Sequence, residues 1–434
     1  MAKKKIVILG AGLAGLSAAW HLQKKCIEPR VFEAESEVGG LCRSKTINGF
    51  TFDCDGHILH FKREDTFNFI NSLLSGNLLG HKRSAWIYSH QRYIRYPFQA
   101  NLYGLPHPVV KECLLGYIHK NGLLVRKEDL TFADWIAHSF GMGIAKHFMV
   151  PYNTKFWTVP PRELTCEWLG GFIPVPSLGQ VIEGTIEESR RQFGYNAHFW
   201  YPKTGGINQL PLALASQIKN IYTNCRVSKI DLNKKEVSFD SGAQEKFDFL
   251  ISTIPLPEMP GLIKGMPTGK RLLFKQLRWN SVFNLNLGIE KKDYFSRHWA
   301  YFPQKSLSFF RVGFFHNFSS SLAPAEKTSM YVEASYSKDK PIDKKNILSR
   351  IQDDLIKIGL LSKQDKICAQ DVNDIKYGYP IYDKNYRQAR KSILEYLSQN
   401  NIFSVGRYGS WRYLSMEDVI LDGKVAASCI LENV

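Results

Sequence analysis

Apolar and glycine-rich stretches at the start of the chain predict a strand, a tight turn and a helix. Residues 6–9 form an apolar run typical of a buried parallel strand, and apolar residues recur with helical spacing over 16–22. The turn between them carries Gly10, Gly12 and Gly15. In this pattern the first glycine allows a sharp turn, the second lets a pyrophosphate approach the backbone, and the third lets helix pack closely on strand. We expect phosphate groups at the N-terminus of this helix.

A carboxylate and a second glycine pair follow this unit. Residues 30–32 predict the next strand, which ends at Glu33, about where an acidic residue binds the ribose hydroxyls of a dinucleotide. Gly39 and Gly40 predict a second close approach of the backbone to a bulky cofactor, and Arg43 could contact its phosphates. A glycine turn in an unrelated α/β domain is the alternative, but the order of strand, turn, helix and acid favours dinucleotide binding.

Further along, the pattern predicts helical and strand-rich blocks that alternate. Residues 49–60 predict a turn and a short strand, 84–96 a hairpin, and 280–335 a series of strands. Helices are expected at 62–82, 108–118, 130–149, 177–193, 346–359 and 418–431, and further strands at 226–232, 236–239, 247–254 and 402–407. We therefore predict an α/β fold in which a Rossmann-like nucleotide-binding domain is interleaved with a mixed helical and antiparallel-sheet substrate domain. The first comprises residues 1–65, 196–265 and 386–434, and the second 66–195 and 266–385.

Composition narrows the class of protein. At 434 residues, with 44% hydrophobic and 13% aromatic residues, the chain can bury two substantial cores. No window approaches a transmembrane span, and the basic residues at the start lead into a strand, so we expect a cytoplasmic protein. The eight cysteines form no CxxC pair, so we predict neither a metal site nor a disulfide framework.

Net charge indicates the sign of a partner but not its kind. The formal charge of +17 suits an anion such as a nucleotide diphosphate, a lipid-linked phosphate or a membrane surface. Lysines are spread along the whole chain, with no single basic helix and no nucleic-acid motif, so we expect no nucleic-acid partner. Peripheral membrane contact stays open, and the oligomeric state is unknown from the sequence.

Several segments carry a resemblance to a known family. The second glycine turn, residues 37–43, resembles that of the flavoproteins that include amine oxidases, protoporphyrinogen oxidase and UDP-galactopyranose mutase, which implies FAD as cofactor. More specific segments resemble the UDP-galactopyranose mutases, especially their eukaryotic-type branch, and occur in the family's order along the whole chain. They are residues 96–99, 132–157, 168–170, 201–206, 299–303, 311, 378–380 and 406–413.

The resemblance implies an unusual reaction. The family interconverts the pyranose and furanose forms of a nucleotide-diphosphate sugar, with N5 of reduced FAD as the nucleophile on the anomeric carbon and no net redox change. It implies a small nucleotide-sugar substrate, a role in cell-envelope or glycan synthesis, and a reductant for the flavin such as NADH or NADPH. The protein must position the sugar, hold the departing diphosphate and exclude water.

Positions that match the family receive candidate roles. His57, on the loop beside the isoalloxazine, and Arg311, which matches the arginine that holds the diphosphate, are the candidate catalytic residues. Tyr301 and Tyr379 match phenols that bind the same diphosphate. The other candidate substrate-binding residues are Tyr96, Gln99, Asn153, Trp157, Trp299, Arg407 and Tyr413. The candidate cofactor-binding residues are Gly10, Gly12, Ala14, Gly15, Glu33, Gly40, Leu41, Arg43, Gly56, His57, Val227, Gly406, Arg407, Met416 and Asp418.

The chain also departs from the family. Phe172 and Tyr88 stand where the family has arginines, Asp55 replaces the first glycine of its Gly-Gly-His loop, and Ser415 replaces a bacterial aspartate. Losing one charged contact to a diphosphate would cost on the order of 2 kcal/mol. Nearby arginines that could take over are Arg92, Arg95 and Arg162. Phe172 and Tyr88 favour the alternative function, a FAD-dependent oxidoreductase of the amine oxidase or protoporphyrinogen oxidase type.

Some of these residues have two interpretations. An arginine after two phenylalanines in a strand, as Arg311 is, either pairs with a buried acid or is held ready for an anion, and we favour the anion. His57 is either a flavin-side group, with Asp55 as its partner, or a hinge residue. Of Arg407 and Arg412, we expect one at the flavin and the other in a structural role.

Overall fold

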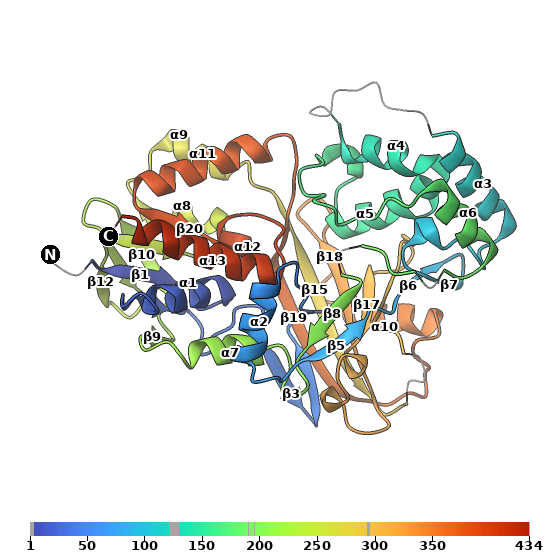
Figure 1. Cartoon of the computed structure of the whole chain (residues 1–434), viewed down its shortest axis with the longest axis horizontal. Helices are drawn as coiled ribbons and strands as arrows, with labels where there is room; N and C mark the ends of the chain where they lie inside the picture. The colour runs from blue at the N-terminus through green and yellow to red at the C-terminus, as the bar shows by residue number, and fades with distance from the viewer. Residues whose placement is uncertain (1–3, 121–129, 190, 195, 293–295, 434) are drawn as a thin grey trace.

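The computed structural model describes residues 4–120, 130–189, 191–194, 196–292 and 296–433. Two lobes lie side by side (Figure 1). One lobe holds both chain ends and a parallel sheet with helices against it, and the other holds a large sheet with a group of helices at its far end. Within the described ranges, no helix combines the length and the apolar character needed to cross a membrane.

The parallel sheet joins strands that are distant in the sequence. Its order is β20, β13, β1, β2, β9, and each neighbouring pair is parallel. The strands are β1 (Ile6–Leu9), β2 (Arg30–Phe32), β9 (Ile221–Tyr222), β13 (Phe249–Ser252) and β20 (Ile402–Ser404). Every residue of β1 and β13 is buried, which explains their unbroken apolar runs. The parallel sheet predicted for the Rossmann-like part of the α/β fold is therefore confirmed.

Helices α1 (Leu13–Gln23) and α13 (Met416–Leu431) pack closely on one another in this lobe. A Cβ atom on Gly423 would lie 2.3 Å from the carbonyl oxygen of Ala14, so the absence of a side chain permits the contact. The other helices of the lobe are α2 (Glu64–Leu73), α7 (Gln209–Ala215), α8 (Met259–Leu262), α9 (Thr268–Phe274), α11 (Tyr386–Gln399) and α12 (Gly406–Gly409). A small sheet contains β10 (Val227–Asp231), β11 (Glu236–Phe239), β12 (Gln244–Lys246) and β14 (Ile263–Lys264).

The second lobe contains the large sheet, which has seven strands. Its order is β19, β15, β18, β17, β16, β6, β7, and its neighbouring pairs are antiparallel except β16 with β6. The strands are β6 (Ala85–Ser89), β7 (Arg92–Arg95), β15 (Trp279–Ile289), β16 (Trp299–Tyr301), β17 (Arg311–Phe314), β18 (Thr328–Tyr336) and β19 (Ile367–Pro380). The predicted hairpin at 84–96 and the strand series at 280–335 are confirmed.

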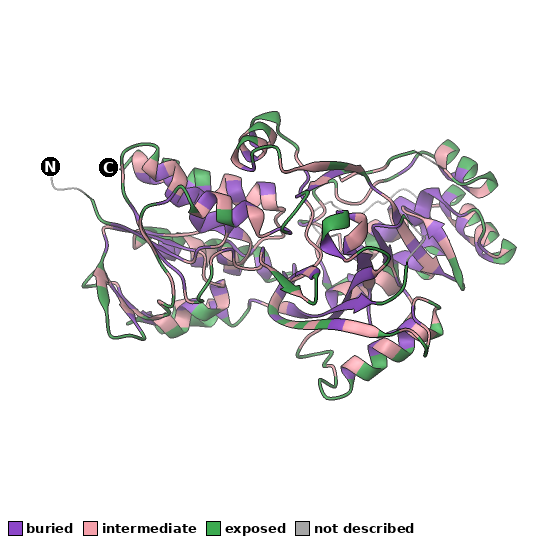
Figure 2. Cartoon of the chain, turned by 90° about the horizontal axis from the view of Figure 1, so that it is seen from below, coloured by how far each residue is buried: buried purple, intermediate pink, exposed green. Residues whose placement is uncertain are grey.

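One face of the large sheet is apolar and the other is polar. Leu285, Val312 and Val332 project from the apolar face and pack with residues of α10 (Ile347–Lys357). Because successive residues of a strand point to opposite faces, Arg311 and Glu333 project from the other face. Figure 2 shows the buried stretches gathered in the strands, with exposed residues on the outer faces of the helices.

The polar face has a defined register. Tyr301 of β16 lies opposite Arg311 of β17, which lies opposite Glu333 of β18. Glu333 lies opposite Asn284 of β15, and Asn284 lies opposite Asn373 of β19. Five polar side chains thus form one row across the sheet, which we call the polar row. The row is a product of strand pairing between segments far apart in the sequence.

Helices gather at the far end of the second lobe (Figure 1). They are α3 (His107–Ile118), α4 (Phe132–Ile144), α5 (Val150–Trp157) and α6 (Leu178–Ile186). A π-helical segment, Ala145–Met149, joins α4 to α5. Within α4, Gly141 has a φ of 73° and a Cβ there would lie 1.9 Å from the carbonyl oxygen of Gly116. Glycine is therefore required where α3 and α4 cross.

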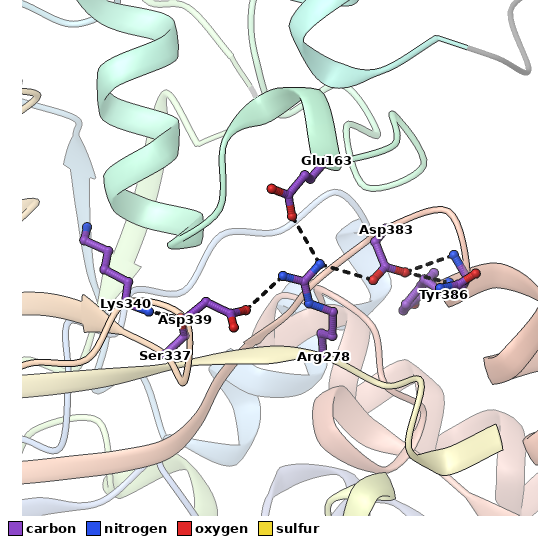
Figure 3. Close-up of polar contacts among 8 residues, drawn as sticks. Glu163, Arg278, Ser337, Asp339, Lys340, Asp383 and Tyr386 are labelled. Atoms are coloured by element: carbon purple, nitrogen blue, oxygen red, sulfur yellow. Dashed lines mark hydrogen bonds and ion pairs between the residues drawn. The ribbon is translucent and has the colours of Figure 1, made fainter. Parts of the chain in front are cut away.

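An arginine joins the two lobes. Arg278, just before β15, contacts Glu163 Oε2 at 3.3 Å, Asp339 Oδ2 at 3.0 Å and Asp383 Oδ2 at 3.5 Å (Figure 3). Asp383 also accepts the backbone N–H of Tyr386 at 3.1 Å, at the start of α11. Through these contacts Arg278 connects the helical end of the second lobe, the large sheet and the first lobe.

The sequence prediction fails at the second half of one helix. We expected a helix over 62–82, but α2 ends at Leu73, because Ser75 and Gly76 adopt positive φ of 50° and 73°. Residues 79–82 form β5 instead, paired with β8. The remaining paired strands are β3 (Ser44–Ile47) with β4 (Phe50–Asp53), and β5 (Leu79–Lys82) with β8 (His198–Tyr201). The helix expected over 177–193 is also shorter, since α6 ends at Ile186.

Candidate functional site

A cavity of about 1090 Å³ lies between the parallel sheet and the polar face of the large sheet. Its wall includes the glycine turn after β1, the end of β2, the loop at Gly56 and His57, and the edge of β19. On the far side it reaches residues of α5. Residues of both lobes therefore line the cavity. This is expected of a site that brings a dinucleotide close to a second molecule.

The glycine turn after β1 has room for phosphate. Gly10 has a φ of +99°, and a Cβ on Gly15 would lie 2.0 Å from the carbonyl oxygen of Gly10, so Gly15 serves close packing and does not line the cavity. At Gly12 a Cβ would meet only the Cα of Gly40, at 3.9 Å, and both glycines line the cavity. The space beside Gly12 is therefore open to a ligand at the N-terminus of α1.

Glu33 closes this end of the site. Its Oε2 accepts the backbone N–H of Ala11 at 2.7 Å, and its Oε1 accepts that of Glu35 at 3.0 Å. The residue is 8% exposed and lines the cavity. Two backbone donors hold the carboxylate, which keeps lone pairs for a ribose. The turn, the open space at Gly12 and this fixed carboxylate fit an adenosine diphosphate group such as that of FAD.

Most of the other candidate cofactor residues also reach the cavity. The residues of the set that line it are Gly10, Gly12, Ala14, Glu33, Gly40, Leu41, Arg43, Gly56, His57, Val227, Gly406, Arg407 and Met416. Asp418 does not. Its carboxylate accepts the Ser415 hydroxyl at 2.7 Å and the Ser415 N–H at 3.0 Å, which caps α13, and it lies 3.4 Å from Lys62 Nζ. The helix cap thus accounts for the position of Asp418, and a contact of this residue with the cofactor stays a prediction.

Arg311 is paired with an acid. Its Nε and Nη2 donate to the two carboxylate oxygens of Glu333, which has no exposed surface. Arg311 still lines the cavity, with a side chain 20% exposed. Of the two interpretations of the sequence, pairing with a buried acid is observed, and the binding of an anion by Arg311 stays a prediction. The pair was hidden because Glu333 lies 22 residues away on another strand.

Arg407 is held differently. Its guanidinium lies 4.9 Å from the ring centre of Tyr379 and 4.8 Å from that of Tyr413, and all three side chains line the cavity. Among the described residues it forms no ion pair, and its buried Nε has no hydrogen-bond partner. A half-buried cation between two phenol rings but lacking a carboxylate is suited to an anionic ligand. Arg412 instead pairs with Asp422 and donates to Ser410 at 3.0 Å, so its role is structural.

Aromatic side chains form the substrate end of the cavity. Tyr96, Trp299, Tyr301, Tyr379 and Tyr413 all line it. Burial raises the pKa of the Tyr301 phenol, and Arg311 only partly offsets this, so the group stays a protonated hydrogen-bond donor at neutral pH.

Trp157 does not belong to this wall. It has no exposed surface and does not line the cavity, because its ring packs in the core against Trp168 and Tyr382. Tyr152 and Phe156, one helical turn apart on α5, line the cavity in its place. Their spacing of four residues in the sequence was a usable signal that we missed.

The amide side chains of Gln99 and Asn153 line the cavity, and the nitrogen of each already donates a hydrogen bond within the protein. Gln99 Nε2 donates to the carbonyl of Pro174 at 2.6 Å, and Asn153 Nδ2 donates to that of Met149 at 2.7 Å. Each side chain therefore has a fixed orientation, and the remaining hydrogen-bonding capacity of each lies at its oxygen.

The loop from Asp55 to His57 lies against β18. A Cβ on Gly56 would lie 2.5 Å from the Tyr331 ring, so only glycine fits there. His57 Nδ1 lies 3.1 Å from the backbone oxygen of Asp55, while the Asp55 carboxylate accepts the Gly56 N–H at 2.8 Å. The contact that the structure records between Asp55 and His57 thus involves the backbone and not the carboxylate. Tyr331 was not among the sequence candidates.

Of the two positions at which the family has an arginine, Phe172 lies in the cavity wall and Tyr88 does not. Phe172 lines the cavity and packs on Tyr413, with ring centres 5.2 Å apart. Tyr88 packs on Phe302 outside the cavity. Arg95, suggested as a replacement cation, pairs with Glu188 and does not line the cavity. The wall therefore gains an aromatic ring at Phe172 and no arginine from the hairpin.

Residues 13–431 match the family described as flavin containing amine oxidoreductase. Among solved structures, a reduced UDP-galactopyranose mutase matches with a TM-score of 0.94 and 27% identity, covering 99% of this chain and 96% of that one. A putative protoporphyrinogen oxidase from Exiguobacterium sp. 255-15 matches with a TM-score of 0.77 over the full length of both chains, but at 15% identity the likeness concerns the fold alone.

Curated relatives are more distant or shorter matches. A 4,4'-diapophytoene desaturase from Methylomonas sp is 24% identical over 76% of this chain and 72% of the desaturase. Protoporphyrinogen oxidase 2 of Arabidopsis thaliana is 33% identical over 91 residues, which are 21% of this chain and 17% of that protein.

Proposed function

Because the chain belongs to the family of flavin-containing amine oxidoreductases, we propose that it uses FAD to interconvert the pyranose and furanose forms of a nucleotide-diphosphate sugar. One observation carries this proposal. A reduced UDP-galactopyranose mutase matches almost the whole chain, with a TM-score of 0.94 at 27% identity. The other solved structure described above shares the fold at 15% identity, and the cavity holds the cation and phenols that such a reaction needs.

When bound and reduced, FAD would supply a nucleophilic ring nitrogen. The glycine turns, Glu33 and Arg43 would hold its adenosine and phosphate groups, and Gly56 with His57 would lie near its ring system. The chain's own work concerns the sugar diphosphate. Arg407 offers a desolvated cation to the diphosphate as it leaves the sugar, and the phenols of Tyr301 and Tyr379 offer neutral donors.

Water exclusion follows from the same wall. The rings of Tyr152, Phe156 and Tyr413 pack edge-on or tilted against neighbouring rings, so the reacting sugar would meet few mobile polar groups. The diphosphate must stay in place while the sugar ring opens and closes, because it returns to the same carbon. A fixed guanidinium between two phenol rings meets that requirement better than an exposed lysine.

The test uses the flavin-loaded protein and UDP-galactofuranose. We expect conversion to UDP-galactopyranose only after the flavin is reduced with dithionite under anaerobic conditions. Oxidised protein is the matched control, and borohydride treatment of the reduced mixture should leave a sugar attached to the flavin. A colourless protein that takes up no FAD, or equal rates in both redox states, would contradict the proposal.

A second candidate is an oxidoreductase of the amine oxidase or protoporphyrinogen oxidase type. Glu333 already neutralises Arg311, and Phe172 adds a ring where an arginine would bind phosphate, so the cavity also suits an aromatic or amine substrate. Oxygen consumption with an amine or a porphyrinogen, without sugar isomerisation, would favour it over the mutase.

The reductant, the domain division and the location of the protein are proposals as well. NADH or NADPH would reduce the flavin, which anaerobic bleaching of the flavin absorbance by each dinucleotide can test. The domain division at residues 1–65, 196–265 and 386–434 against 66–195 and 266–385 can be tested by limited proteolysis. Cytoplasmic location and a role in cell-envelope synthesis rest on the resemblance and on sequence composition alone.

A further inference from the structure

Arg83 is a buried arginine beside the cavity, immediately after β5. The residue is 6% exposed, and among the described residues it forms no ion pair with an acidic side chain. Its Nη1 donates to the amide oxygen of Asn196, its Nη2 donates to the carbonyl oxygen of Phe193 at 2.5 Å, and its backbone N–H donates to that of Ala197 at 2.9 Å. A charge buried against neutral oxygens alone costs free energy, so packing by itself would favour an apolar residue here.

The same guanidinium covers the ring of Tyr96. Its central carbon lies 4.5 Å from the ring centre, which is within the range of a cation–π contact. Tyr96 lines the cavity, and its ring packs on that of Tyr301 with ring centres 5.5 Å apart. Arg83 itself does not line the cavity. It therefore contacts this part of the cavity wall from outside.

Asn196 is the second cavity residue that Arg83 holds. Its side chain lines the cavity, and its oxygen accepts from Arg83, which leaves the amide nitrogen to donate to a ligand. Tyr96 follows β7 and Asn196 precedes β8, so two segments distant in the sequence meet on one guanidinium. A planar guanidinium can stack on a ring and donate in its own plane at the same time, which a lysine ammonium cannot do.

A small pocket beside Tyr96 contains two further arginines, but both of these have acidic partners. Arg83, Arg95 and Arg191 all line it. Arg95 pairs with Glu188, and Arg191 also pairs with a glutamate. Arg83 is therefore the arginine of this pocket whose charge no carboxylate neutralises within the described ranges. Because Arg191 is exposed, a small solute can reach the pocket without passing through the cavity.

We propose that Arg83 is a positioning residue, which fixes Tyr96 and Asn196 as the wall against which the nucleotide part of the substrate binds. The inference rests on the proposed function, because it concerns the same nucleotide-sugar site. Holding a ring and an amide in place before the substrate arrives lowers the ordering cost of binding. Arg407 and the phenols that face the diphosphate stay unchanged without Arg83. Its loss should therefore raise KM and leave kcat nearly the same.

The experiment compares Arg83→Lys with a matched variant, Arg297→Lys. Arg297 is also buried, and its guanidinium lies 4.3 Å from the ring centre of Tyr93, but neither residue lines the cavity. Binding of UDP-galactose to the FAD-loaded, oxidised protein is measured by calorimetry, and KM and kcat are measured with UDP-galactofuranose after reduction. We expect Arg83→Lys to raise the dissociation constant and KM about ten-fold while kcat stays within about two-fold. Arg297→Lys should match the parent protein in all three.

A double variant tests whether Arg83 acts through the cavity wall. Tyr96→Leu removes the ring that the guanidinium covers. In that background Arg83→Lys should weaken UDP-galactose binding by much less than it does in the parent protein, because residues that act through one contact have non-additive effects. Fully additive losses would show that Arg83 supports the fold in general, and they would overturn the inference.

Chemical rescue supplies a second, independent readout. Arg83→Ala removes the side chain beside the small pocket, and guanidinium ions should then restore part of the UDP-galactose affinity. Tens of millimolar guanidinium chloride are enough for this test and lie far below the concentrations that unfold proteins. Sodium chloride at the same concentration is the control, and an equal response to both salts would overturn the inference.

The remaining outcomes separate this inference from the proposed function. Parental affinity for UDP-galactose in both Arg83→Lys and Arg83→Ala, or equal losses in Arg83→Lys and Arg297→Lys, would overturn the role of Arg83 and leave the mutase proposal standing. A lower kcat at unchanged KM would do the same. Absence of UDP-galactose binding to the parent protein would overturn the proposed function and this inference with it.

Discussion

The two faces of the large sheet show how one set of strands separates stability from chemistry. Val312 and Val332 on one face have no exposed surface and pack with α10, whereas Arg311 and Glu333, each next to one of them in the chain, face the cavity side. Neighbouring residues thus serve opposite purposes because the side chains of a strand alternate. The apolar face tolerates no charge, while the polar face holds the charges of Arg311 and Glu333 because the two residues pair in register.

The largest expected effect comes from placing a charge on the apolar face. In Val332→Asp the carboxylate would be buried without a cation, at a cost of several kcal/mol, so we expect little folded protein. Val332→Thr, which buries only a hydroxyl, should lose about 1–3 kcal/mol of unfolding free energy in urea and keep FAD. A stable Val332→Asp protein with a normal melting curve would show that the two faces do not differ as described.

The second largest effect is expected from replacing Arg407, which should weaken ligand binding without lowering the free energy of unfolding. Arg407→Lys keeps the positive charge but loses the planar fork stacked between Tyr379 and Tyr413. We expect UDP-galactose to bind some tens of fold more weakly, equivalent to about 2 kcal/mol. The matched control is Arg412→Lys, whose arginine pairs with Asp422 outside the cavity and should leave binding unchanged. Equal losses in both variants would argue against a special role for Arg407.

A smaller gain should follow from adding a cation to the cavity. Phe172→Arg restores the residue type that the family resemblance places at this position, beside Tyr413. We expect UDP-galactose to bind about ten-fold more tightly, because one charge-assisted contact is added. Phe172→Leu controls for loss of the ring and should not strengthen binding. If Phe172→Arg weakens UDP-galactose binding but leaves oxidation of an amine detectable, the oxidoreductase becomes the better reading.

The smallest expected effect concerns two thiols that line the cavity. Burial raises the pKa of Cys42 and Cys54 to about 12, so almost no thiolate is present at neutral pH. Iodoacetamide should therefore label the exposed Cys26 while Cys42 and Cys54 stay unmodified, as peptide mass spectrometry can measure. Unfolding in urea should make all three react. Rapid labelling of Cys54 in the native protein would instead indicate a reactive thiol.

Local patterns in the sequence were enough to predict the first unit and its ligand class. Gly10, Gly12 and Gly15 act within one turn, and Glu33 follows at the end of the next strand, so their geometry depends on short-range backbone constraints. The resemblance to the mutases added Arg407 and the tyrosines, because those segments recur in a fixed order. The break in the helix expected over 62–82 was missed, although Gly76, with a positive φ and an N–H donated to Asn71 O, is a common helix-ending signal.

Only the tertiary structure decided which charges meet. Nothing in the sequence near Arg311 identifies Glu333, 22 residues further along on another strand, as its partner. Likewise Trp157 and Phe156 are adjacent in the chain, yet Phe156 lines the cavity and Trp157 fills the core. Strand register and helix orientation fix these outcomes, because both depend on long-range packing that a single sequence does not display.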